Sequence, residues 1–240
     1  MITRSRVWRL YHECCGTKHR SVNIDSVSKI ICVAKNYSDV STERAIPLTA
    51  RMSSAAIFLK PPSSITSIEP TINLFGYTDV ICETELAVQI QNPIPRNMVE
   101  VTDEQLLSSI GGFGIAFDLT RKDLQNKLKA EGKPWELSKA FDNACPLSEL
   151  CKADGSDWLS EPMDISLTVN DQLILRQPTT HMILSIADLL RTITRDFSLW
   201  PGDIILTGTP TKPHQPPRIK PGDKLRASLG KYMTIETHVV

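Results

Sequence analysis

The chain of 240 residues lacks the features that mark several common classes of protein. Lys plus Arg and Asp plus Glu both number 27, so no excess of charge indicates binding to nucleic acid or to an anionic membrane surface. No apolar run approaches the roughly 20 residues of a membrane span. No G-x-G-x-x-G or Walker motif follows a run that reads as a strand, which argues against nucleotide binding. We therefore expect neither a nucleic-acid partner nor a membrane partner.

The cysteines and histidines show none of the spacings of a zinc site. The six cysteines form no C-x-x-C pair, and the five histidines form no H-E-x-x-H motif. The basic N-terminus also lacks the apolar segment of a secretory signal, so we expect reduced thiols and a cytoplasmic location. We predict an N-terminal arm over residues 1–24, which packs on the core or on a partner subunit, and a single domain over residues 25–240.

Short runs rich in β-branched and aromatic residues are what the chain does contain, and they predict strands. Asn170-Asp171 between two such runs indicates a hairpin. Pro-Gly-Asp precedes a strand-like run twice, at residues 201–203 and 221–223. The other predicted strands lie within residues 28–37, 56–60, 77–90, 113–119 and 164–175.

A capping box predicts the first of three helices. Thr102 is followed three residues later by Gln105, so the two side chains can satisfy each other's backbone N–H groups at a helix start. We expect this helix to reach Ile110 and to end at Gly111 and Gly112.

Two further helices are predicted downstream. Thr120 with Asp123 indicates a second capping box, opening a helix that Gly132 ends, and Ser185 caps an amphipathic third helix. Many short strands, three helices and no regular βαβ alternation predict a β-rich α+β fold rather than a doubly wound one.

Three acidic residues stand out because each lies in an apolar strand. Glu83 and Glu85 belong to YTDVICETELAVQI, residues 77–90, and Asp118 belongs to FGIAFDL. Side chains two residues apart in a strand share a face, so the two glutamates lie side by side. Such a pair is either solvated or holds something positive, and hard divalent cations take carboxylate oxygens as ligands. The residue types alone leave ordinary polar faces and a metal site both open.

Cationic and amide side chains follow Asp118 closely. Lys122 and Gln125 are three residues apart and hence on one face of the predicted helix, and Lys139 lies in an apolar segment between two aromatic residues. Beside a metal, these groups would suit a dicarboxylate or an enolate, because they stabilise oxyanion charge. A solvated lysine at a helix start is the alternative for Lys122.

Five sequence segments carry a resemblance to a known family. They are ETEL at 83–86, the block from 112 to 150, NYSD at 36–39, FLKP at 58–61 and GDIILTGTP at 202–210. Together they resemble the fumarylacetoacetate hydrolase superfamily, and they are most similar to its short bacterial and mitochondrial members that act on acylpyruvates and oxaloacetate. The resemblance covers roughly residues 25–240.

The resemblance implies a mixed β-sandwich roll, a homodimer and a site for Mg²⁺ or Mn²⁺. The implied metal ligands are Glu83, Glu85 and Asp118. The implied substrate-binding residues are Lys122, Gln125 and Thr209, and the implied catalytic lysine is Lys139.

The chain departs from the family pattern in NYSDVSTE, residues 36–43. The family has N-Y-x-x-H there, and its histidine, often with a glutamate three residues later, activates a water. Val40 stands at the histidine position, which leaves Glu43 as the remaining catalytic candidate of the pair. Valine cannot transfer a proton, and general base catalysis is worth about 10²–10⁴-fold in rate. We therefore expect hydrolysis of C–C bonds to be weak or absent.

Three functional hypotheses follow. The first is a divalent-metal enzyme that acts on small 2-oxo or enol dicarboxylates by isomerisation, decarboxylation or hydrolysis, and tautomerisation needs only a metal and an acid/base such as Lys139. The second, favoured by Val40, is a catalytically impaired relative that binds metal or ligand without efficient turnover. The third is an interaction module that uses residues 1–24.

Overall fold

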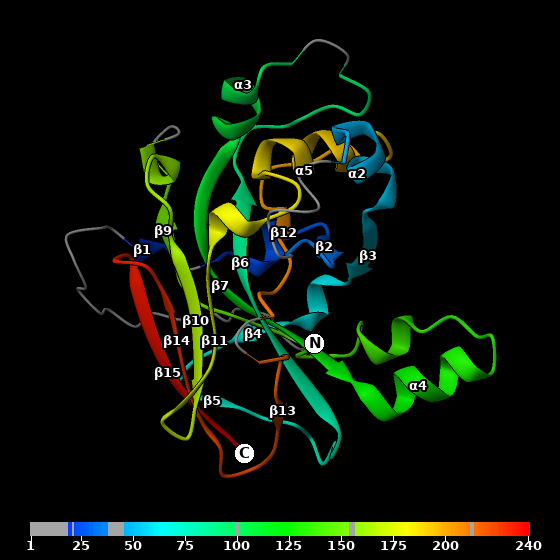
Figure 1. Ribbon diagram of the computed structural model, residues 1–240, viewed down its shortest axis with the longest axis vertical. Coiled ribbons are helices and arrows are strands. Elements are labelled where there is room, and N and C mark those ends of the chain that lie inside the picture. The colour runs from blue at the N-terminus through cyan, green and yellow to red at the C-terminus, as the bar shows by residue number, and fades with distance from the viewer. Residues whose placement is uncertain (1–18, 21, 38–45, 99–100, 154–156, 212–213) are drawn as a thin grey trace, which may run out of the picture.

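Two mixed β-sheets account for most of the molecule (Figure 1). The computed structural model describes residues 19–20, 22–37, 46–98, 101–153, 157–211 and 214–240. The large sheet follows the order β1 (His19–Arg20), β9 (Leu150–Lys152), β7 (Ile110–Arg121), β6 (Val80–Ile90), β12 (Ile204–Leu206), β2 (Ile30–Ala34) and β3 (Ala56–Lys60). Its side strands are β13 (Arg218–Ile219), which pairs with β6, and β8 (Cys145–Leu147), which joins β4 (Ile65–Ser67) to β7.

The smaller sheet packs against the large one. Its order is β11 (Gln172–Pro178), β10 (Asp164–Val169), β14 (Lys224–Leu229), β15 (Met233–Val239) and β5 (Thr71–Ile72). Most neighbouring strands are antiparallel, but β12 with β2, β15 with β5 and β4 with β8 are parallel. The β-rich α+β prediction is therefore confirmed.

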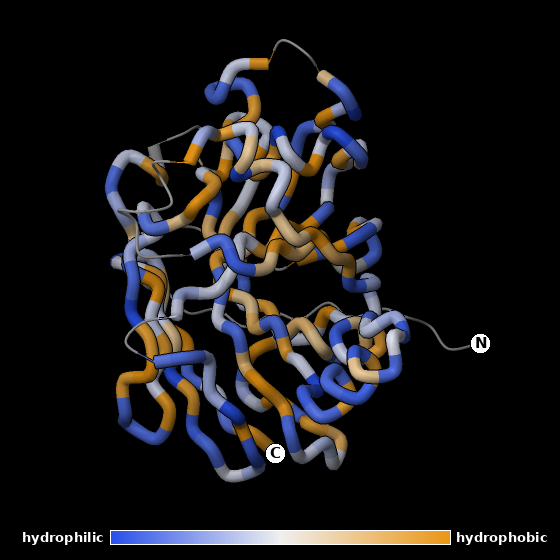
Figure 2. The backbone as a smooth tube through the Cα atoms, turned by 45° about the vertical axis from the view of Figure 1, so that its right-hand side comes forward, coloured by the Kyte–Doolittle hydropathy of each residue, from blue (hydrophilic) through white to orange (hydrophobic). Residues whose placement is uncertain are grey.

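Apolar side chains cover both faces of the large sheet, in alternation. On β6, Leu86 and Val88 belong to the main core between the sheets, whereas Ala87 belongs to a second, smaller core on the opposite face. On β7, Phe117 lies in the main core and Ala116 in the second. Figure 2 shows many hydrophobic residues along the backbone segments that cross the centre of the molecule, whereas the lower turns carry both hydrophilic and hydrophobic residues. The face that carries the second core is the one on which the acidic residues lie.

Four α-helices are described, and three of them gather at one end of the molecule (Figure 1). The α-helices are α2 (Leu48–Ser54), α3 (Asp103–Leu107), α4 (Lys122–Ala130) and α5 (Ile186–Ile193). Five 3₁₀ turns accompany them: η1 (Ile24–Ser26), η2 (Pro62–Ser64), η3 (Glu136–Ser138), η4 (Asp157–Leu159) and η5 (Thr179–His181). Both α2 and α3 contact α5, whereas α4 projects from the side of the molecule beyond the end of β7.

Several local predictions are confirmed. The capping box of Thr102 and Gln105 is present at α3, and the Ser185 hydroxyl caps α5. The hairpin turn of Asn170 and Asp171 has both residues at positive φ, as a two-residue hairpin turn requires. Gly132, at φ +65°, follows the last residues of α4.

Other local predictions are wrong. α3 ends at Leu107, and Gly111 and Gly112 belong to β7 instead of ending a helix. A Cβ on Gly112 would lie 3.2 Å from the carbonyl oxygen of Cys151, so a small residue is needed where β9 approaches. Helix α2 was not predicted, because it is short, has no side-chain cap and buries only Met52.

The second predicted capping box is also absent. Thr120 lies inside β7, and the N-cap of α4 is Arg121, which makes no side-chain capping bond. The Thr120 hydroxyl donates instead to Glu83 Oε2, at 3.1 Å. A carboxylate on the paired strand therefore competes successfully for this hydroxyl.

The N-terminal part of the chain is only partly described. Cys14, Cys15 and the rest of residues 1–18 lie outside the described residues, and β1 pairs with β9 at the edge of the large sheet. A separate arm over residues 1–24 stays a prediction.

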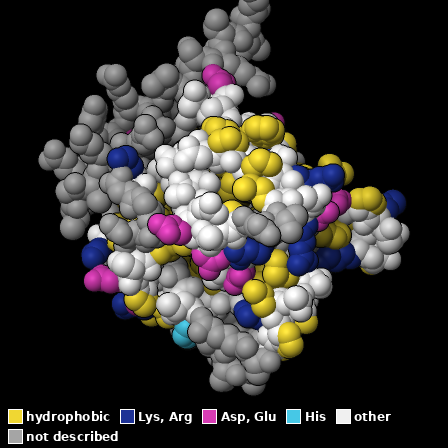
Figure 3. Space-filling model, turned by 90° about the horizontal axis from the view of Figure 1, so that it is seen from above, with side chains coloured by type: hydrophobic (Ala, Val, Ile, Leu, Met, Phe, Trp, Pro, Cys, Tyr) yellow, Lys and Arg dark blue, Asp and Glu magenta, His cyan; other side chains and the backbone are white. Residues whose placement is uncertain are grey.

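None of the described helices is long and apolar enough to cross a membrane. Acidic and basic side chains lie near one another on the face seen in Figure 3.

The two Pro-Gly-Asp turns offer a matched test of packing. Gly202 and Gly222 have φ of +99° and +93°, but a Cβ on Gly202 would lie 2.2 Å from the carbonyl oxygen of Ser26, whereas one on Gly222 would meet nothing within 4 Å. Gly222→Ala should cost about 1–2 kcal/mol, for the left-handed backbone alone. Gly202→Ala should cost more, because Ser26 must move. Urea unfolding of both variants measures the difference, and equal costs would contradict the predicted clash.

Candidate functional site

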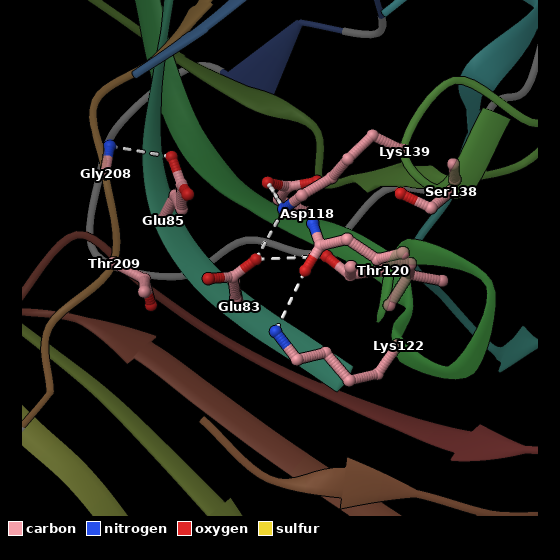
Figure 4. A network of polar contacts seen from close by, with 12 residues as sticks. Glu83, Glu85, Asp118, Thr120, Lys122, Ser138, Lys139, Gly208 and Thr209 are labelled. Carbon is pink, nitrogen blue, oxygen red and sulfur yellow. Dashed lines mark hydrogen bonds and ion pairs between the residues drawn. The ribbon is translucent and has the colours of Figure 1, made fainter. Parts of the chain in front are cut away.

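Pairing of β6 with β7 brings the predicted acidic residues together. Glu83 is the direct cross-strand partner of Asp118, and Glu85 lies two residues further along the same face of β6. All three point to the side of the second core, together with Thr120 of β7 (Figure 4). Glu85 and Asp118 are buried, with 3% and 2% of their surface exposed, whereas the Glu83 side chain is 27% exposed. The site therefore opens to solvent on the Glu83 side.

Lys139 joins two of these carboxylates. It follows η3, and its Nζ lies 2.5 Å from both Glu83 Oε2 and Asp118 Oδ2 (Figure 4). The ring centroid of Phe58 lies 5.0 Å from the same nitrogen, so the ammonium has an aromatic face on one side. Only 6% of Lys139 is exposed, so its pair with the buried Asp118 is shielded from water, whereas its pair with Glu83 is open to solvent on the glutamate side.

A second lysine, Lys60, approaches Asp118 from another direction. It ends β3, is 1% exposed, and places Nζ 2.8 Å from Asp118 Oδ1, an ion-pair contact rather than a well-directed hydrogen bond. The same ammonium donates to the carbonyl oxygens of Leu119, Ala144 and Lys139. Lys60 thereby ties β3, β7 and the backbone of Lys139 together behind the carboxylates.

Glu85 has a different partner, the backbone. Gly208, in the loop after β12, donates its N–H to Glu85 Oε2 at 2.7 Å (Figure 4). No described Lys, Arg or His makes an ion pair with Glu85. Burial and the nearby carboxylates of Asp118 and Glu83 raise the pKa of Glu85 well above its ordinary value, against the opposing effects of Gly208 and Lys139. Glu85 is thus a buried acid whose charge is poorly compensated.

The lysines have the opposite effect on Asp118. Burial by itself raises the pKa of Asp118, but Lys139 and Lys60 lower it further than burial raises it. Burial likewise lowers the pKa of Lys139, but Asp118 and Glu83 raise it above the usual range of a lysine. The Asp118 carboxylate and the Lys139 ammonium therefore each hold the other in its charged form.

The predicted substrate-binding residues lie around these acids. Lys122 Nζ donates to Gln125 Oε1 at 2.9 Å, and Gln125 is buried on the first turns of α4. The hydroxyl of Thr209 donates to the carbonyl oxygen of Thr84, which lies between the two glutamates on β6. Figure 4 shows Lys122 and Thr209 on opposite sides of Glu83.

Most of the predicted catalytic segment NYSDVSTE lies outside the described residues. Glu43, the predicted catalytic glutamate, and Val40 fall within residues 38–45, outside the described part of the chain. Conversely, the sequence reasoning did not single out Lys60, although a lysine inside the apolar run AIFLK was a usable signal. The contribution of Gly208 is a backbone N–H, so no residue type could reveal it.

The side chains as placed form a charged cluster rather than a closed metal cage. Among the described residues, no group of three or more His, Cys, Asp or Glu is gathered closely enough to hold a metal ion. Lys139 Nζ stands between Glu83 and Asp118, and Glu85 turns towards Gly208. The donor set of three carboxylates beside a poorly compensated buried acid nevertheless suits a hard divalent cation, which takes oxygen ligands.

Comparison with known proteins identifies the class to which this fold and site belong. The model of the C-terminal domain of fumarylacetoacetate hydrolase matches residues 29–240, so the chain belongs to the fumarylacetoacetate hydrolase family. It is similar to oxaloacetate tautomerase YcgM of Escherichia coli, with 35% identity over 187 residues that cover 77% of this chain and 81% of the relative. It is also similar to the mitochondrial oxaloacetate tautomerase fahd-1 of Caenorhabditis elegans, with 35% identity over 76% of this chain and 82% of the relative.

Solved structures agree with this assignment. Yeast ynq8, a fumarylacetoacetate hydrolase family protein, superposes with a TM-score of 0.78 at 27% identity, over 91% of this chain and 96% of that one. The predicted family resemblance is therefore confirmed.

Replacing the buried acid should stabilise the protein when metal is withheld. Because the folded-state pKa of Glu85 lies above its ordinary value of 4.5, the folded protein keeps a proton there that the unfolded chain releases, so stability falls as the pH rises from 4.5 towards the folded-state pKa. Glu85→Gln keeps an oxygen for Gly208 and removes the charge. With EDTA present, its free energy of unfolding should exceed that of the wild type at pH 8, and the difference should shrink towards pH 4.5. Urea unfolding at both values tests this; a less stable variant at pH 8 would contradict it.

Removing the buried cation should have the opposite effect. Lys60→Met leaves Asp118 with one lysine and three carbonyl oxygens without their donor, so we expect a loss of about 3–5 kcal/mol in the free energy of unfolding. The matched control is Lys122→Met, which loses one partly buried hydrogen bond to Gln125 and should cost about 1 kcal/mol. Urea unfolding in EDTA compares them, and similar losses would show that Lys60 is not a structural counter-charge.

Proposed function

We propose that this chain is a divalent-metal enzyme that interconverts the keto and enol forms of a small 2-oxo dicarboxylate such as oxaloacetate. The observation that carries the proposal is Lys139, a buried ammonium held against Glu83 and Asp118 beside the poorly compensated Glu85. The names of the similar proteins of Escherichia coli and Caenorhabditis elegans support this substrate class.

The three carboxylates would hold the metal, Mg²⁺ or Mn²⁺. Glu83, Glu85 and Asp118 offer the oxygen ligands that both ions prefer, and the poorly compensated charge of Glu85 favours a cation. When bound, the metal would supply a Lewis acid that stabilises the enolate oxygen of a chelating 2-oxo acid. Because Lys139 contacts both Glu83 and Asp118, metal binding must compete with these ion pairs.

The substrate's carboxylates have cationic and polar partners nearby. Lys122 is held by Gln125 at the start of α4, so its ammonium is already oriented before a substrate arrives. On the other side of Glu83, the hydroxyl of Thr209 lies beside β6. We infer that Lys122 and Gln125 bind a carboxylate and that Thr209 binds the other end of the substrate.

Lys139 is the proton-transfer group of the proposal. In the enol-to-keto direction, the enol oxygen loses one proton and the second carbon of the enol double bond, the one without the oxygen, gains one, so the reaction needs no net proton. Asp118 and Glu83 keep Lys139 an ammonium and raise its pKa, so in these ion pairs it is a weak acid. With Glu83 and Asp118 engaged by a cation instead, Lys139 would lose that stabilisation, give its proton to carbon and take back the proton of the enol oxygen, which balances the protons. Because tautomerisation needs no activated water, the valine at position 40 does not prevent it, whereas it disfavours C–C hydrolysis.

A second candidate function is a catalytically impaired relative that binds metal or ligand without turnover. Two observations favour it: the valine at the usual histidine position and the pairing of Lys139 with two proposed ligands.

The homodimer, which light scattering can test, and the cytoplasmic location both remain predictions.

Metal binding is the first test. Calorimetric titration of Mg²⁺ or Mn²⁺ into EDTA-treated protein should give saturable binding, and oxalate, an enolate mimic, should tighten it. Glu83→Gln should abolish the heat of binding, because a proposed ligand loses its charge. The matched control is Glu161→Gln, an exposed glutamate paired with Lys231, which should bind metal normally. Absence of binding with and without oxalate would sink the metal proposal.

Turnover tests the role of Lys139. Lys139→Ala should lower kcat for oxaloacetate tautomerisation by about 10²–10⁴-fold, measured by the ultraviolet absorbance of the enol, because the proton donor is lost. Lys122→Ala should mainly raise KM, because it removes a binding cation. Undiminished turnover in Lys139→Ala would exclude it as the proton donor. Oxalate and metal binding without turnover in the wild type would favour the impaired relative.

A further inference from the structure

Asn36 is a buried amide whose hydrogen-bonding groups are all engaged near the site. It follows β2, is 2% exposed, and its Nδ2 donates to the carbonyl oxygens of Leu184 and Thr207, at 3.2 and 2.9 Å. Its Oδ1 accepts from the backbone N–H of Leu184 at 2.8 Å. One side chain thereby links the end of β2, the residues before α5 and the loop after β12.

The bond to Thr207 matters because of the peptide unit to which that carbonyl belongs. The same planar unit carries the N–H of Gly208, which donates to Glu85 Oε2 at 2.7 Å. In a trans peptide the C=O and N–H point in opposite directions, so fixing the carbonyl fixes the direction of the N–H. Asn36 thus holds one end of a peptide whose other end holds Glu85.

The local backbone makes this restraint necessary. Gly208 has φ of +98°, a conformation that residues with a Cβ rarely adopt. Because glycine has no Cβ, no side chain at position 208 restricts the rotation of the Thr207–Gly208 peptide. A Cβ on Gly208 would lie 2.8 Å from the Cβ of Asn36, so the two residues pack closely. The hydroxyls of Thr207 and Thr209 donate to the carbonyls of Leu86 and Thr84 on β6 and so hold the loop against this strand. Neither of these side-chain bonds involves the C=O or N–H of the Thr207–Gly208 peptide.

We propose that Asn36 is a positioning residue, which orients the Thr207–Gly208 peptide so that its N–H fixes the carboxylate of Glu85. The proposal rests on the proposed metal site for its functional consequence, because the direction of Glu85 decides whether its oxygens can reach the ion. Outer-shell partners of this kind are worth about 10–100-fold in metal affinity. Asn36 touches neither substrate nor metal in this scheme.

Two variants separate positioning from simple packing. Asn36→Asp keeps the acceptor for Leu184 and loses the amide donor to Thr207, whereas Asn36→Leu loses all three bonds at similar size. The control is Asn170→Ala, which removes two comparable side-chain bonds, to Asp223 and to the N–H of Lys224, in the smaller sheet. A role in packing alone predicts that the three variants differ only in stability.

The first readout needs no metal. In EDTA, the amide proton of Gly208 should resonate downfield in the wild type, because it donates to a carboxylate, and should move upfield in both Asn36 variants and in Glu85→Gln. Asn170→Ala should leave it in place. An unchanged Gly208 resonance in Asn36→Asp would overturn the proposal, whether or not the protein binds metal. If neither Asn36 variant folds, hydrogen exchange in the wild type decides: rapid exchange of the Gly208 amide would overturn it, and protection would uphold it.

The second readout is affinity for Mn²⁺ by calorimetry. We expect Kd to rise about 10–100-fold in the Asn36 variants and to stay within about twofold in Asn170→Ala. A wild type that binds no Mn²⁺ would refute the proposed function and leave the Gly208 measurement to judge Asn36. A wild type that binds, with both Asn36 variants binding equally well, would refute the positioning role alone.

Discussion

The register of β6 on β7 is the constraint on which the rest of this structure depends. It sets Glu83 opposite Asp118, and the two-residue repeat of a strand then puts Glu85 and Thr120 on the same face. A shift of one residue would send these side chains into the main core, where Leu86 and Phe117 now lie. The alternation of large apolar and small or acidic residues along both strands specifies this register. The fold and the site are therefore encoded by the same pattern.

Charge is arranged unevenly within the cluster, and that unevenness defines its chemistry. Asp118 lies between two ammonium groups, whereas Glu85 has one backbone N–H and no cation among its described neighbours. Burying like charges is unfavourable unless each is paired with an opposite charge. Because neither lysine contacts Glu85, burial of this acid costs stability. The extensive apolar packing of the two sheets offsets this cost, and charged groups with perturbed pKa values of this kind are common at functional sites.

Much of this could be read from the sequence, and the failures have physical causes. The strands of the site, the α3 and α5 caps and the hairpin at Asn170 follow from local patterns, which tertiary contacts did not override. The Thr120 cap failed because Glu83, distant in sequence, takes its hydroxyl. Gly208 contributes a backbone N–H to Glu85, and the side-chain amide of Asn36 donates to a backbone carbonyl, so a pattern of residue types does not indicate either contact. Local sequence patterns therefore do not predict the polar contacts between residues that are distant in the sequence.

Enclosure of Lys60 has a consequence for the response of the site to salt. Mobile ions screen charges in solution over about 8–10 Å at physiological ionic strength, but they cannot enter the space between a fully enclosed ammonium and Asp118. Lys122, by contrast, is partly exposed to solvent, so mobile ions can screen its charge. Ionic strength should thus alter how readily an anionic ligand is captured while leaving the internal charge balance around Asp118 nearly constant. Lys60 is thus a built-in counter-ion for Asp118 whose charge the salt of the surrounding solution does not screen.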